Sequence, residues 1–195
     1  MSENRRKLIE AAYDEFLEVG FSEASLESIA ARAGTELEVV RALFIDIDSL
    51  LKVLLKEVTD PIVSTIALVT DNADDPRTMI SECLRLMDQW LLVNPKYIQL
   101  IRSCMAEGSA AMRDIYRQSL YPSDFYERLS GFVKSGKILG GDILMVMVLL
   151  DSLMFFPHLV MPAIKEMIGD ESEKDFHSRR REAIMNLLDR GMFAD

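Results

Sequence analysis

The side chains that commonly carry enzyme chemistry are few in this sequence. Histidine occurs only as His158 and His177, and cysteine only as Cys83 and Cys104. Neither pair, nor any combination of the four, has the close spacing of a metal site. No glycine-rich phosphate loop and no nucleophile motif is present. The sequence therefore predicts neither an enzyme nor a bound cofactor or metal.

A different chemistry, the binding of an apolar small molecule, fits the side chains of the central and C-terminal regions. Pockets for such molecules have apolar walls with a few polar groups. The sequence also has 12 Met, whose flexible side chains adapt to irregular cavities. The candidate ligand-binding residues are Met87, Trp90, Met105, Tyr116, Phe125, Met154, Phe155 and His158. The alternative, that each is an ordinary core side chain, stays open.

Helices must position these residues, because apolar positions recur with the helical period and no strand-like alternation occurs. The spacing predicts an all-α fold with helices over 4–19, 26–33, 36–43, 47–70, 77–93, 95–107, 109–120, 123–135, 142–168 and 172–192. The last two are long, and the helix over 142–168 is more apolar than one face of a monomer needs. This excess predicts a homodimer.

The first three helices are short and have clear end signals. Gly20 and Gly34 are expected to end the first two helices, and Ser25 to cap the second. Thr35 and Glu38 have the spacing of a capping box, which would open the third helix. Three short helices joined by glycine-containing turns predict a helix-turn-helix arrangement.

Composition indicates a globular chain that stays in the cytoplasm. Hydrophobic residues make up 49% and charged residues 28% of the sequence. The N-terminus is polar, which predicts no signal peptide. The apolar segment 143–164 has the length of a membrane span, but Asp151, Pro157 and Pro162 interrupt it. A buried core or interface helix is therefore expected, and no membrane association.

The N-terminal quarter carries a recognisable series of motifs. The segment 6–21, RKLIEAAYDEFLEVGF, resembles the first helix of the tetracycline-repressor (TetR) family of transcription regulators. The segment 25–34, SLESIAARAG, is similar to the second helix of that family, in which small residues allow close packing before the turn. Phe44 followed by Leu50 and Leu51 resembles the start of the fourth helix.

The resemblance implies two domains with different functions. Residues 1–46 would form a DNA-binding domain, with the third helix in the major groove. Residues 47–195 would form the ligand-binding and dimerisation domain, and the last two helices would pair with those of a second copy. The candidate DNA-binding residues are Ser25, Thr35, Glu36, Leu37, Val39 and Arg41.

The third helix departs from the family pattern where phosphate contacts are expected. The family usually has a small residue, Tyr, His and Lys around this helix, and the positions here read Glu38, Arg41, Leu43 and Ile47. Residues 1–50 contain five basic and eleven acidic side chains, a net charge of −6, within a chain of net charge −10. DNA-binding modules normally present a basic face, because phosphate neutralisation supplies much of the affinity.

Two interpretations stay open. In the first, the chain is a TetR-like transcription regulator that binds operator DNA as a dimer and responds to an apolar small molecule. In the second, DNA binding has been lost, and the acidic N-terminal face binds a protein partner.

Overall fold

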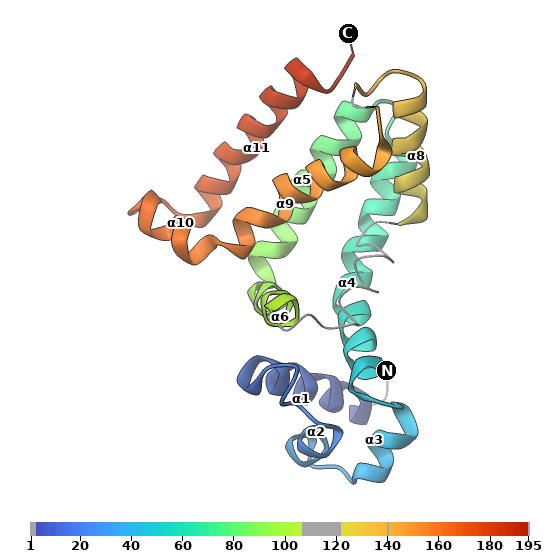
Figure 1. The fold of residues 1–195 in the computed structure, drawn as a ribbon, viewed down its shortest axis with the longest axis vertical. Helices are drawn as coiled ribbons and strands as arrows, with labels where there is room; N and C mark the ends of the chain where they lie inside the picture. Colours follow the sequence, from blue (N-terminus) through green and yellow to red (C-terminus); the bar gives the residue numbers. More distant parts are fainter. Residues whose placement is uncertain (1–2, 107–121, 140, 195) are drawn as a thin grey trace. The chain divides into compact units, whose positions relative to one another are not determined.

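The computed structural model describes residues 3–106, 122–139 and 141–194 (Figure 1). Its helices confirm the predicted all-α class, and the expected helix over 109–120, with Tyr116, lies outside the described residues. The elements are α1 (Glu3–Val19), α2 (Leu26–Ala33), α3 (Leu37–Leu43), α4 (Ile47–Asn72), α5 (Pro76–Val93), α6 (Pro95–Ala106), α8 (Ser123–Lys134), α9 (Ile143–Leu159), α10 (Met161–Ile168) and α11 (Glu173–Gly191).

Helices α1, α2 and α3 form a helix-turn-helix around a small apolar core of Phe16, Ile29, Val40 and Phe44. Ser25 caps α2 as predicted, since its hydroxyl accepts a hydrogen bond from the Ser28 backbone N–H at 3.0 Å. Helix α6 packs against α1 on the other side.

The predicted capping box of Thr35 and Glu38 is wrong. Helix α3 begins one residue later than that motif requires, with Glu36 at the N-cap and no side-chain hydrogen bond there. The reason lies in the end of α2. Gly34 adopts a left-handed conformation with φ of 64°, and the Thr35 N–H then donates to the Ala30 carbonyl at 3.0 Å. Thr35 therefore closes α2 instead of opening α3.

The C-terminal half is built around α5, which packs against both α9 and α11, while α8 packs against α9. Asp75 caps α5, and Pro76 occupies its first turn. Beyond the helices, an isolated antiparallel bridge joins Ile138 to Phe193 and so connects the segment after α8 with the end of α11.

The predicted single helix over 142–168 is wrong, because the chain breaks at Val160. The two resulting helices, α9 and α10, are bent by 72°. Pro162 lies in the first turn of α10, where its missing N–H and fixed φ suit the start of a helix. Among the described residues, no single helix is long and apolar enough to cross a membrane, and this bent pair meets those criteria only together.

The chain forms two compact units. One contains the described residues of 1–61 and 95–120, and the other contains those of 62–94 and 121–195. Helix α4 belongs to both, and the division falls at Pro61, inside the helix. These units do not coincide with the predicted domains 1–46 and 47–195. That division concerns function and stays a prediction.

Candidate functional site

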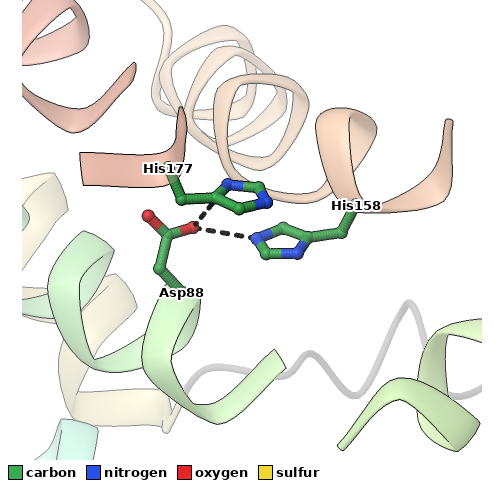
Figure 2. Close-up of side chains that lie close together, drawn as sticks. All are labelled: Asp88, His158 and His177. Carbon is green, nitrogen blue, oxygen red and sulfur yellow. Dashed lines mark hydrogen bonds and ion pairs between the residues drawn. The ribbon is translucent and has the colours of Figure 1, made fainter. Parts of the chain in front are cut away.

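The interior of the second unit contains a cluster of five polar side chains, which we call the Asp88 cluster. Asp88 comes from α5, His158 from α9, and His177, Arg180 and Arg181 from α11. Asp88 and His177 are 0% exposed, whereas the Arg181 side chain is 23% exposed. Figure 2 shows both imidazole rings beside the Asp88 carboxylate. The cluster therefore joins three helices through groups that normally face water.

The Asp88 carboxylate accepts hydrogen bonds from three members of the cluster, one on α9 and two on α11. His158 Nε2 lies 2.9 Å from Oδ1, Arg181 donates to Oδ2 at 2.9 Å, and Arg180 also donates to Oδ1. Burial acts to raise the pKa of Asp88, but the hydrogen bond from His158 and the charge of Arg180 hold it below its usual value. An ionised carboxylate only accepts, so Nε2 is the protonated nitrogen of His158.

His177 is the least satisfied member of the cluster. Its ring stacks on that of His158, with centroids 4.0 Å apart and planes at 7°. Within the described part of the chain neither ring nitrogen has a hydrogen-bond partner, although the residue is fully buried. Its Nδ1 lies 3.9 Å from Asp88 Oδ1, which is too far for a hydrogen bond. Burial lowers the pKa of His177 to about 4, and the neighbouring His158 and Arg180 add to the effect. His177 is therefore neutral near pH 7.

Asp88, His158 and His177 bring potential metal-ligand atoms within 4.8 Å of one another. The detailed geometry suits a metal poorly. A histidine nitrogen binds a metal in the plane of its ring, and two parallel stacked rings cannot both direct a lone pair at one ion. Both carboxylate oxygens of Asp88 also accept from arginines, which would repel a cation. The cluster is better described as one carboxylate held by two guanidinium groups and an imidazole.

Sequence reasoning identified only His158 from this cluster. The separation of 70 residues between Asp88 and His158 hides their contact from any local pattern. One signal was available within α11. His177, Arg180 and Arg181 are spaced i, i+3 and i+4, which places them on one face of the helix.

The helix-turn-helix has its own electrostatic pattern. All four of its arginines contact carboxylates, and the Arg41 guanidinium on α3 donates to Glu27 of α2 at 2.7 Å. The other pairs are Arg5 with Glu57 at 2.7 Å, Arg6 with Glu10 at 3.8 Å, and Arg32 with Glu15 and Glu18 at 2.8 and 2.5 Å. The basic groups of this module are therefore already partly neutralised by the protein itself.

The candidate DNA-binding residues occupy different environments. Val39 and Arg41 are both exposed on α3, and Glu36 is exposed at its N-cap. Leu37 and Thr35 are half-buried, and the Ser25 hydroxyl is engaged in the cap of α2. Side chains on α3 are therefore the ones accessible to a partner.

Several solved structures that match this chain are transcription regulators. A TetR family regulator from Marinobacter aquaeolei has a TM-score of 0.71 at 16% identity, covering 98% of this chain and 96% of its own. A regulator of the TetR/AcrR family from Thermobifida fusca has a TM-score of 0.62 at 18% identity, covering 95% and 98%. A fatty acid degradation regulator from Bacillus halodurans has a TM-score of 0.67 at 16% identity, covering 95% and 96%. The chain has the TetR-family fold.

No family model matches the sequence, and no curated protein matches it. The likeness is one of architecture, and it extends over both compact units. Within the TetR fold, most of the candidate ligand-binding residues lie in the second unit. Met87, Phe125, Met154 and His158 are buried there, and Trp90 and Phe155 are half-buried. Met105, in the first unit, is exposed, and Tyr116 lies outside the described residues.

The Asp88 cluster predicts a large cost for removing its carboxylate. Asp88→Ala leaves two guanidinium groups without a counter-charge in the interior, and breaking a buried ion pair in this way costs about 3–5 kcal/mol. Urea unfolding measures the change. Glu82→Ala on the same helix is the control, because its pair with Arg85 is exposed and its loss should cost less than about 1 kcal/mol. Equal costs for the two variants would contradict a structural role for the cluster.

His177 predicts a specific loss of stability in acid. Its pKa is about 4 in the folded chain and 6.5 ordinarily, so the unfolded chain binds this proton at higher pH. The stability from neutral His177 is present above pH 6.5 and is lost as the pH falls toward 4. Unfolding in urea at pH 7 and pH 5 should differ by about 2 kcal/mol from this group alone.

His177→Phe is the matched variant, since it keeps a ring against His158 and removes the titration. The difference between pH 7 and pH 5 should shrink in His177→Phe by about the same 2 kcal/mol. An unchanged difference would show that another group causes the acid sensitivity.

Proposed function

We propose that this chain is a TetR-type transcription regulator of the cytoplasm, without enzymatic activity, that binds operator DNA as a homodimer and responds to a mainly apolar small molecule. The main support for this proposal is the match to TetR-family structures over 95–98% of the chain, which includes the helix-turn-helix. DNA binding, the response to a small molecule and dimerisation are each assigned to a different region of the chain.

Contact with DNA is assigned to the exposed face of α3. Arg41 is the basic residue of α3, and Val39 is exposed on the same helix. The pair between Arg41 and Glu27 does not prevent such contact. Both side chains are more than half exposed, and such pairs are worth about 0–1 kcal/mol, so a DNA phosphate or base can replace Glu27. The acidic surroundings predict modest affinity and a shallow dependence on salt.

Response to a small molecule is assigned to the second unit. Met87, Phe125 and Met154 are buried on three different helices there, which supports a largely apolar site. One structural relative is a fatty acid degradation regulator, and this supports an effector with a long apolar part. The other candidate residues of this unit, Trp90, Phe155 and His158, are on α5 and α9.

Dimerisation is assigned to the outer face of α9 together with α11. Five large apolar side chains on α9 are exposed: Leu144, Met145, Val148, Leu149 and Phe156. They lie on the side opposite the buried stripe of Val146, Leu150, Met154 and His158. Leu187 of α11 is exposed as well. An exposed apolar surface of this kind is typical of a protein interface, and a second copy of the chain is the occupant that we propose.

A second candidate function is binding to a protein in place of DNA. The pairing of the four helix-turn-helix arginines with carboxylates favours it, as does the mixture of apolar and acidic groups around α3. Leu43 and Ile45 are exposed at the end of α3, Ile45 by 93%, and Glu36 and Glu38 are exposed at its start. A basic partner with an apolar face would complement this surface.

The dimer proposal predicts that Leu149→Glu produces a monomer. A charge at this exposed position would be buried without a partner in the dimer, at little cost to the fold of the monomer. Sedimentation velocity at micromolar concentration measures the change. Met167→Glu on α10 is the control, a still more exposed apolar position outside the exposed face of α9. A wild-type chain that is monomeric would overturn the proposal.

The DNA proposal predicts opposite effects for the two partners of one ion pair. Arg41→Glu removes the basic group of α3 and should abolish binding to a palindromic operator, since one arginine contact is worth about 1–3 kcal/mol and a dimer loses two. Glu27→Gln should strengthen binding by releasing Arg41 and removing a negative charge. A gel shift at low ionic strength, using the DNA upstream of the protein's own gene, measures both.

The same assay separates the two candidate functions. Specific retardation by the wild-type chain supports DNA binding. If even low salt gives no retardation, protein binding is the better account, and Glu36→Lys with Glu38→Lys should then weaken the protein complex.

A further inference from the structure

The Asp88 cluster has more positive than negative charge. Arg180 and Arg181 each carry a positive charge, Asp88 carries one negative charge, and His177 is neutral near pH 7. The net charge of the cluster is therefore at least +1. Burial acts against this charge, since it lowers the pKa of Arg180. An uncompensated charge in a protein interior is costly, and a bound anion would remove the imbalance.

The cluster also contains hydrogen-bonding atoms without partners. Arg180 Nε is buried and donates to nothing among the described residues, although the terminal nitrogens of the same guanidinium contact Asp88 and the Leu153 carbonyl. Both ring nitrogens of His177 are also buried without a hydrogen-bond partner among the described residues. A neutral imidazole always has one N–H to donate. Arg180 Nε and one ring nitrogen of His177 are therefore buried donors without an acceptor, and they lie where positive charge is in excess.

Asp88 itself shows which acceptor suits these groups. Its carboxylate is already held by two guanidinium groups and an imidazole, and planar carboxylates match the fork of arginine donors. Arg181 is the most exposed member of the cluster, and part of its side chain is accessible to solvent. A second carboxylate would find a similar set of donors in Arg180, Arg181 and His177.

The surroundings of the cluster are apolar. Leu84 and Leu91 lie one helical turn on either side of Asp88, and Met154 lies one turn before His158; all three are buried. A ligand with its charged end at the arginines would therefore have apolar side chains along its remaining length. This combination favours an amphipathic molecule over a small hydrophilic anion.

We propose that Arg180, Arg181 and His177 bind the carboxylate of an amphipathic effector, whose apolar chain lies against α5 and α9. The inference rests on the effector part of the proposed function and names the chemical class of that effector. It does not depend on DNA binding. A fatty acid has the required chemistry, a single carboxylate on an apolar chain.

Titration calorimetry of the purified full-length chain tests the head group directly. Decanoate, decan-1-ol and decyl phosphate have the same apolar chain and differ in the head group. Decanoate should bind at least about tenfold more tightly than decan-1-ol, since a hydrogen bond to a charged group is worth about a factor of ten or more. Equal affinities would overturn the proposal, and tighter binding of decyl phosphate would overturn the assignment to a carboxylate.

Two neighbouring arginines of α11 provide a matched pair of variants. Arg181→Gln removes one donor of the cluster and should weaken decanoate binding about tenfold, with little change for decan-1-ol. Arg179→Gln removes an exposed arginine that pairs with Glu171, and should change neither affinity. Equal effects of the two variants would count against the site. If Arg181→Gln does not fold, as judged by circular dichroism, the comparison of ligands on the wild-type chain still decides.

The outcome is separable from that of the DNA proposal, because the calorimetry contains no DNA. Decanoate binding without operator binding would support the carboxylate site and overturn the regulator function. Operator binding without any preference for decanoate would support the regulator function and overturn the carboxylate site.

Discussion

The arrangement of α5, α9 and α11 depends on one buried carboxylate. Asp88 is completely inaccessible to water, and an isolated charge in that position would cost far more than the stability of a typical domain allows. It is tolerated because α9 supplies His158 and α11 supplies Arg180 and Arg181. The charge therefore restricts how the three helices can pack, since sliding one of them by a turn would leave a buried ion without its partner.

This constraint differs from the one that holds the helix-turn-helix together. There the core is apolar and small, built from Phe16, Ile29, Val40 and Phe44, and Glu15, which pairs with Arg32, is a buried charge. The pairs of Arg5, Arg6 and Arg41 lie on or near the surface, where each contributes little to stability. Surface charge can therefore vary without loss of the fold. A TetR-like helix-turn-helix with an acidic surface is consistent with this separation of core and surface.

The two regions also differ in what they offer a partner. The face around α3 presents exposed apolar groups among carboxylates, whereas the Asp88 cluster presents excess positive charge in an apolar interior. The first suits a large partner that covers a surface, and the second suits a small anion that can be enclosed. The break at Val160 lies just beyond His158, so the path of the chain changes direction next to the cluster.

The sequence alone determined the helical architecture and the helix-turn-helix, because these follow from local signals. Apolar periodicity, Ser25, Gly34 and the Asp75-Pro76 cap each act within a few residues. Local signals misled where a neighbouring element competed. The Thr35 N–H bonds to the end of α2, and the single helix predicted over 142–168 breaks just before Pro162. Only the tertiary structure brought Asp88, His158 and the α11 residues together, since contacts across 70 to 93 positions depend on helix packing and leave no periodic trace. The pairing of Arg41 with Glu27 was hidden for the same reason, because two helices must meet before their charges do.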